Sequence, residues 1–123
     1  MAMYPPIFSI CKAAAAVTAL IGLNPCRLYP FGEAPQSTVK PYAVWQSIGG
    51  SPENYMDRTP DADAFILQVD VYAETAAKAR GVAEAIRDAV EPHAHITSWR
   101  GEGKDSETKL RVFSFDLSWI VRR

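Results

Sequence analysis

The spacing of apolar residues along the chain predicts two amphipathic helices. The first runs from about Pro6 to Ile21; a proline at its start is tolerated because the first-turn N–H groups have no partner within a helix. The second begins after Thr75, which can cap its first turn, and runs to about Val90, with Pro92 ending it. Each helix has one apolar face, so each needs a second layer to cover that face.

Alternation of apolar and polar residues predicts five strands. The clearest is Ala64–Ala73, and the last is Leu110–Val121. Weaker patterns indicate strands at Cys26–Pro30, Tyr42–Ile48 and His93–Trp99. The expected order is α-β-β-β-α-β-β. We therefore expect an α+β fold with a mixed or antiparallel sheet and both helices packed on one face.

Two charged segments interrupt these elements. Gly49–Asp63 contains two glycines, two prolines and scattered charges, and it is the least structured stretch of the chain. Its length predicts a long projecting loop or, alternatively, a hairpin extended beyond the domain. Its large apolar residues are Tyr55 and Met56. The second segment, Arg100–Lys109, is expected to be a charged loop or hairpin turn.

The two clearest strands each carry a second row of side chains that is mostly polar. Gln68 and Asp70 lie in this row on one strand, and Ser114, Asp116 and Ser118 lie in it on the other. The apolar rows of these strands are expected to face the core. The polar row then either faces solvent or lies against another copy of the protein.

Composition limits the classes of function. The chain has 123 residues, of which 48% are hydrophobic, so residues 1–123 are expected to form one domain with its own core. With 13 basic and 14 acidic residues the net charge is −1, which argues against coating nucleic acid or docking on an anionic membrane. The apolar stretch Ala13–Leu23 is too short to span a bilayer. Cys11 and Cys26 are expected to be reduced, buried thiols.

Neither candidate metal cluster has a complete set of ligands. His93 and His95 would point the same way on a strand, but no third ligand lies nearby in the sequence. Asp57, Asp61 and Asp63 lack the glycine and terminal glutamate of an EF-hand loop. We expect no metal and no cofactor.

The remaining catalytic candidate is a pair of carboxylates. Asp70 and Asp116 would act as acid and base only if their strands are neighbours, and an exposed polar row accounts for both without catalysis. We therefore expect no enzymatic activity. A small ligand- or metal-binding enzyme is the weaker alternative.

Several short segments occur in an order typical of one known family. Arg27–Pro30, Ala34–Gln36 and Pro41–Gln46 come first; Val69–Thr75 then leads into an alanine-rich helix, and Val112–Trp119 closes the chain. Together they resemble the bacteriophage tail completion family, also called the tail terminator or head-tail joining family.

This resemblance, from about Ile7 to Arg122, implies a structural protein of a long-tailed phage virion, synthesised in the bacterial host cytoplasm. Such proteins form a ring, usually hexameric, which ends growth of the tail tube at its head-proximal end. The implied partners are further copies of the chain, the tail tube protein and the head-connector or neck proteins. DNA passes through the lumen without specific binding. The alternative within the virion is a neck, head-closure or other tail component.

The residues expected to make these contacts lie in the polar row and in the two charged segments. A closed ring needs two different surfaces on each subunit, and exposed strand edges can extend a sheet from one copy to the next. A lumen that passes DNA should not bind phosphate, so acidic or neutral side chains suit it. The candidate residues are Tyr55, Met56, Asp57, Arg58, Asp70, Arg100, Glu102, Lys104 and Asp116, with Asp70, Glu102 and Asp116 as candidates for the lumen.

Overall fold

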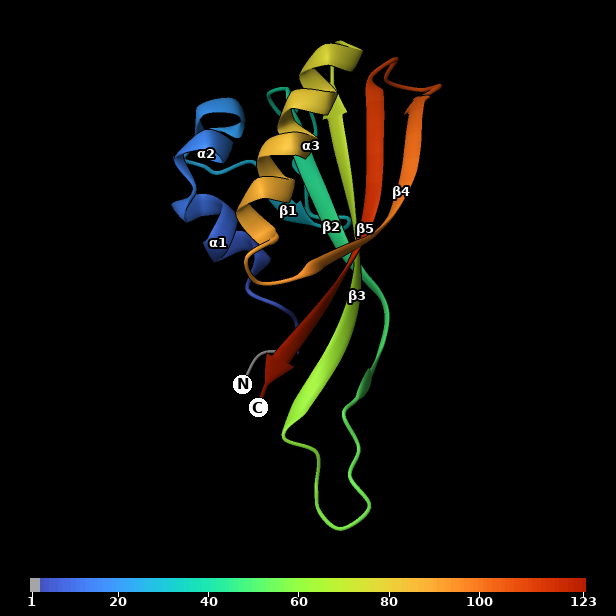
Figure 1. The fold of residues 1–123 in the computed structure, drawn as a ribbon. Coiled ribbons are helices and arrows are strands. Elements are labelled where there is room, and N and C mark those ends of the chain that lie inside the picture. Colours follow the sequence, from blue (N-terminus) through green and yellow to red (C-terminus); the bar gives the residue numbers. More distant parts are fainter. Residues whose placement is uncertain (1–2) are drawn as a thin grey trace.

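The computed structural model describes residues 3–123, and within them the chain folds into three helices and five strands (Figure 1). The strands form one mixed sheet in the order β1-β2-β3-β5-β4. β1 is parallel to β2, and the other neighbouring strands are antiparallel. All three helices lie on one side of the sheet. The elements are α1 (Ile7–Ala13), α2 (Ala15–Ile21), β1 (Leu28–Pro30), β2 (Tyr42–Pro52), β3 (Ala62–Ala73), α3 (Ala76–Val90), β4 (His95–Lys104) and β5 (Arg111–Arg122).

The prediction of one continuous helix from Pro6 to Ile21 is wrong. The chain breaks at Ala14, whose backbone is extended (φ −90°, ψ 112°), so α1 and α2 are separate and the order is α-α-β-β-β-α-β-β. The alanine run has high helix propensity, but packing overrides it, because both short helices contact α3. The break therefore lets both helices bury their apolar residues. No helix within residues 3–123 is long and apolar enough to cross a membrane.

The core forms where the apolar rows of β3 and β5 meet the helices. Every residue of the predicted apolar row of β3 is buried, and α3 covers it with a stripe at helical spacing. Thr75 caps α3 as predicted, because its Oγ1 accepts a hydrogen bond of 3.2 Å from the backbone N–H of Lys78. The core residues of β3, β5 and α3 include Phe65, Leu67, Val69, Val71, Phe115, Leu117, Trp119, Val82, Ile86 and Val90.

The predicted strand His93–Trp99 and the loop Arg100–Lys109 are both displaced along the chain. β4 begins only at His95 and continues to Lys104 through two glycines, which argue against a strand in sequence reasoning. The strand forms there because its backbone pairs with β5, Gly101 opposite Ser114 and Gly103 opposite Val112. The turn that joins β4 to β5 is therefore limited to residues 105–110.

Most of the predicted loop Gly49–Asp63 is a hairpin, the alternative left open by the sequence. β2 continues to Pro52 and β3 begins at Ala62, and their pairing extends to Pro52 opposite Asp63. We call residues 49–66 the arm and residues 53–61 the arm tip. The arm projects away from the helices (Figure 1).

Gly50 is required where the arm leaves the body of the sheet. Its φ is +147°, and a Cβ at this position would lie 2.2 Å from the carbonyl oxygen of Ala64 on the facing strand. A Cβ on the neighbouring Gly49 would meet no such heavy atom within 4 Å. Only glycine at position 50 therefore allows the two strands of the arm to approach this closely.

Replacing Gly50 should disturb the arm, and the adjacent glycine supplies the matched control. We expect Gly50→Ala to lower the free energy of unfolding by about 1–3 kcal/mol, because of the strained φ and the contact with Ala64. Gly49→Ala should change it by less than about 0.5 kcal/mol. Urea unfolding followed by circular dichroism measures both, and equal effects of the two substitutions would contradict this account of the arm.

Candidate interaction surfaces

The candidate residues lie on three different parts of the molecule. Tyr55, Met56, Asp57 and Arg58 are at the arm tip. Asp70, Arg100 and Asp116 come together on the sheet face that the helices leave uncovered, which we call the open face. Glu102 and Lys104 lie on β4, beside the start of α3.

The predicted polar row occupies the middle of the open face. Asp116 is only 8% exposed, and its Oδ1 accepts a hydrogen bond of 2.7 Å from Arg100 Nε. That bond and the charge of Asp116 raise the pKa of Arg100. The open face therefore places an ion pair at its centre, with Arg100 the more exposed partner.

The second carboxylate of the open face has different partners. Asp70 Oδ1 accepts hydrogen bonds from Ser114 Oγ at 2.6 Å and from Gln68 Nε2 at 3.0 Å. β3 and β5 are neighbours, with Asp70 opposite Ser114 and Gln68 opposite Asp116, so the two carboxylates are diagonal across the pair of strands. Each carboxylate accepts hydrogen bonds from its own donors, and these bonds hold both side chains in place on the open face.

Apolar side chains flank this polar row. At the arm end, Ile66 and Ile120 are 39% and 60% exposed. At the other end, the rings of Tyr42 and Tyr72 stack with their centroids 5.1 Å apart. The open face thus combines a polar centre with apolar margins, the reverse of the apolar core and polar rim that are typical of a protein–protein interface.

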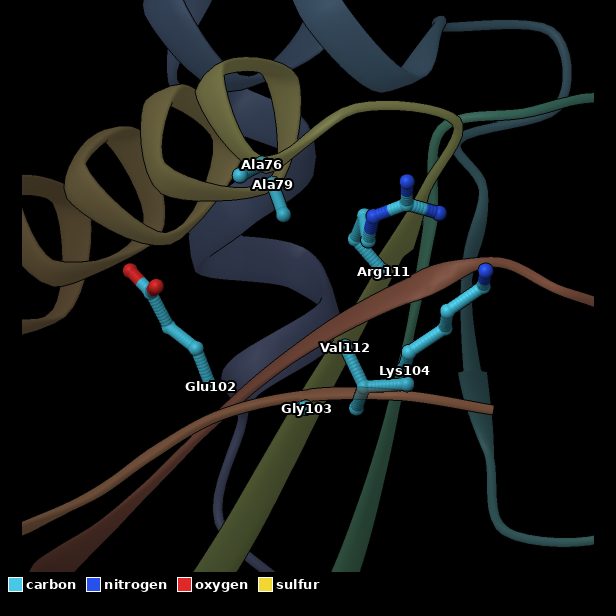
Figure 2. Close-up of a pocket in the computed structure, with 7 residues that line it drawn as sticks. All are labelled: Ala76, Ala79, Glu102, Gly103, Lys104, Arg111 and Val112. Carbon is cyan, nitrogen blue, oxygen red and sulfur yellow. The ribbon is translucent and has the colours of Figure 1, made fainter. Parts of the chain in front are cut away.

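Glu102 lies on the opposite side of the sheet from Asp70 and Asp116. Its carboxylate pairs with Arg80 of α3, with Oε2 2.9 Å from Nη2, and this hydrogen bond lowers the pKa of Glu102. The pair stands beside a cavity of about 170 Å³ between the start of α3 and the β4–β5 pair. Figure 2 shows Glu102 at one end of this cavity and Lys104 and Arg111 at the other. The three candidates for the lumen are therefore divided between the two sides of the sheet, since Glu102 pairs with Phe113, whose row faces the helices.

The arm tip is ordered by contacts among its own residues. The hydroxyl of Tyr55 donates a hydrogen bond of 2.8 Å to Asp61 Oδ1, and the guanidinium of Arg58 lies 4.0 Å from the centre of the Tyr55 ring. Met56, between them in sequence, is completely exposed. The tip therefore presents a flexible apolar side chain beside a fixed cation.

The base of the arm tip is attached to the end of the chain. Nε and Nη2 of Arg123 donate hydrogen bonds to the carboxylate of Asp63 at 3.0 and 2.8 Å, and Nη1 donates to the Pro60 carbonyl at 3.1 Å. The hydrogen bonds from Arg123 lower the pKa of Asp63. The contact joins the arm to β5.

Sequence reasoning missed an apolar groove beside β1. The groove has a volume of about 600 Å³ and is assembled from three segments that are separate in the sequence. Phe8 could have indicated this groove in the sequence, because it is a large apolar residue outside the apolar stripe of the first helix. In the structure it is 38% exposed. We call this site the β1 groove; it is lined by Tyr4, Phe8, Pro25, Cys26, Leu28, Tyr29, Pro30, Glu33 and Trp45.

Trp45 in the β1 groove has an unusual hydrogen-bonding state. Its indole Nε1 is buried, and no group within residues 3–123 accepts a hydrogen bond from it. Tyr4, in the segment ahead of α1, stacks on the indole with ring centroids 5.5 Å apart. A buried N–H without an acceptor is unfavourable, so this donor of a groove-lining residue is left unsatisfied within the described chain.

The two histidines do not form a pair. His93 precedes β4 and stacks against Trp119 at 6.4 Å, whereas His95 is the first, exposed residue of the strand. Among the described residues, no three His, Cys, Asp or Glu side chains are grouped so as to hold a metal ion. Cys11 and Cys26 are buried free thiols as expected, and burial raises the pKa of Cys11 to about 12.

Comparison with known proteins identifies the family. Residues 5–122 match the family described as "Tail completion protein gp17". The chain belongs to this tail completion family. Membership makes it a structural protein of the virion tail, which confirms the family and the location expected from the sequence.

A solved structure shows that the fold of this tail completion protein occurs in a virus-like particle. A chain of the "Virion of native gene transfer agent (GTA) particle" superposes with a TM-score of 0.68 at 14% identity, covering 95% of this chain and 92% of that one. At this identity the likeness establishes the shared fold. No curated protein matches the sequence.

The attachment of the arm should depend on pH in a defined direction. Because Arg123 lowers the pKa of Asp63, the contact stabilises the fold above the ordinary carboxyl pKa, near 3.8, and its contribution is lost as the pH falls through the lowered value. In Arg123→Gln the pKa of Asp63 should rise toward the ordinary value, while the pKa of Glu102 stays low. Carboxyl-detected NMR titration measures both pKa values. A pKa of Asp63 that is the same in Arg123→Gln as in the wild type would contradict the contact.

Proposed function

We propose that this tail completion protein is a tail terminator. Copies of the chain assemble into a ring, hexameric as is usual for terminators, on the head-proximal end of the tail tube. The ring stops addition of tube subunits and offers its other side to the head-connector or neck proteins. The family match over residues 5–122 carries this proposal, and the uncovered sheet surfaces supply the contacts that it needs.

The sheet has two different free edges, which suit a head-to-tail interface. β1 is the edge strand on one side and β4 on the other, and in β4 every residue except Ile96 is exposed. An edge strand has unpaired backbone N–H and C=O groups that another chain can pair with. If the β4 edge of one copy faces the β1 side of the next, the same contact repeats around the ring until it closes.

The open face supplies the surface of the channel in this proposal. Asp70 and Asp116 are on it, and the charge of Arg100 beside them is compensated by its ion pair with Asp116. A channel surface of this kind has little attraction for phosphates, so DNA can slide past it. Glu102 is on the other side of the sheet and has no part in the channel.

The two ends of the sheet would then form the two rims of the ring. Figure 1 shows the β4–β5 turn at one end and the arm at the other. Lys104 and the turn from residue 105 to residue 110 are at the first end, so this rim carries charges of both signs. We assign contacts with the tube or the connector to this turn.

Particles assembled without the protein test the proposed role. Because a terminator stops tube polymerisation, its deletion should give tails longer than normal, and a plasmid copy of the wild-type chain should restore their length. Negative-stain microscopy measures tail length directly. Finished tails of normal length that lack heads would contradict the terminator role and favour the neck or head-closure alternative.

A further inference from the structure

We propose that the arm tip of one copy binds in the β1 groove of the next copy, so that each subunit of the ring holds its neighbour. This inference rests on the proposed ring and adds the contact that closes it. Each subunit contributes one tip and one groove, which are two different surfaces, as a head-to-tail interface requires.

The β1 groove has the properties of a site that needs an occupant. Its walls are mainly apolar, and Tyr4 and Phe8 remain 49% and 38% exposed along it. Trp45 lines it, and the buried indole N–H of this residue has no acceptor in the described chain. An extended peptide segment supplies apolar side chains and backbone carbonyl acceptors together. Tyr4, which precedes α1, stacks on the indole and forms part of the same wall.

The arm tip has the matching chemistry. Met56 is unbranched and completely exposed, and methionine adapts well to irregular apolar sites. Arg58 is already held against Tyr55, so less of its conformational freedom is lost on binding. The tip thus presents one apolar anchor beside an anion, Asp57, and a cation, Arg58.

The charges at the rim of the groove complement those of the tip. Glu33 is the acidic residue that lines the groove. Lys12 stands on the same rim, because its Nζ lies 5.8 Å from the centre of the Phe8 ring. Arg58 can therefore pair with Glu33, and Asp57 with Lys12, while Met56 enters between them. Complementary charges of this kind fix the register of an interface.

The tip and the groove of one chain cannot meet each other. The arm points away from the helices and from β1, and its tip is the most distant part of the molecule in Figure 1. The tip is also fixed in that direction by the contacts of Arg123 with Asp63 and Pro60. The occupant of the groove is therefore the tip of a second copy.

Charge reversal with rescue tests this contact. We expect Arg58→Glu alone and Glu33→Arg alone to raise the protein concentration needed for half-assembly by about tenfold or more, because like charges then face each other. The two substitutions together should restore assembly to within about threefold of the wild type. Mass photometry over a concentration series measures this. Failure of the double variant to recover would overturn the Arg58–Glu33 pairing.

A second pair of variants separates docking from a general effect on the arm. Met56→Glu should prevent ring formation at concentrations where the wild type assembles, whereas Thr59→Glu, in the same tip and with the same charge, should leave assembly unchanged. Circular dichroism should give both variants the melting temperature of the wild type, since the side chains of Met56 and Thr59 are exposed. Normal rings from Met56→Glu would overturn the docking and leave the proposed ring standing.

Cross-linking locates the occupied surface. Met56→Cys can be labelled with a benzophenone maleimide, because the native thiols are buried and the pKa of Cys11 is raised. After mixing with ¹⁵N-labelled wild-type protein, we expect cross-links to residues 4–8 or 25–33 of the other copy. Cross-links within one copy, or to the β4 edge of another, would overturn the inference. A wild-type chain that stays monomeric at every concentration and on isolated tail tubes would contradict both the ring and the docking.

Discussion

The pairing of β3 with β5 is the interaction on which the rest of the structure depends. The two strands pair without interruption from Ala62 opposite Arg122 to Ala73 opposite Arg111. Because side chains alternate along a strand, this single register places Phe65, Leu67, Val69 and their partners under the helices and places the polar row on the other face. A shift of one residue would turn one strand over relative to the other, which would point either Asp70 or Asp116 toward the core and expose the apolar row of that strand. The register therefore defines both the core and the surface available to other proteins.

The same strands connect the body of the sheet to the arm. β3 continues past the core into the arm, and the C-terminal residue of the chain binds back to Asp63 at its base. The proposed ring uses these continuous elements in a simple way: the open face lines the channel, the edges face neighbouring copies, and the arm reaches across the boundary. Each of these surfaces is uncovered within the described chain, and each differs from the others in charge and apolar content, as a head-to-tail interface requires.

The sequence was sufficient to predict features that depend on apolar–polar alternation or on helix capping. It was not sufficient to predict features that depend on contacts between residues far apart in the chain. The rows of β3 and β5, the cap at Thr75 and the buried cysteines follow from local patterns that packing reinforces. The break at Ala14 has no local signal, because an alanine run favours a helix whether or not it is interrupted. The strand at Gly101 and Gly103 exists only through pairing with β5. The β1 groove could not be predicted because it gathers residues from three segments, and the side of the sheet on which Glu102 lies depends on register shifts in β4 that the sequence does not reveal.

The central claim is that this chain acts as a structural subunit, through contacts with its own copies in a ring around a channel. An electron cryomicroscopy map of the head-to-tail junction tests it most directly. The account predicts one closed ring of this chain at the head-proximal end of the tube, with Asp70 and Asp116 of every copy facing the channel and each arm tip seated beside β1 of the adjacent copy. A map with the chain elsewhere in the particle, or with the open face buried against another protein and turned away from the channel, would contradict the account.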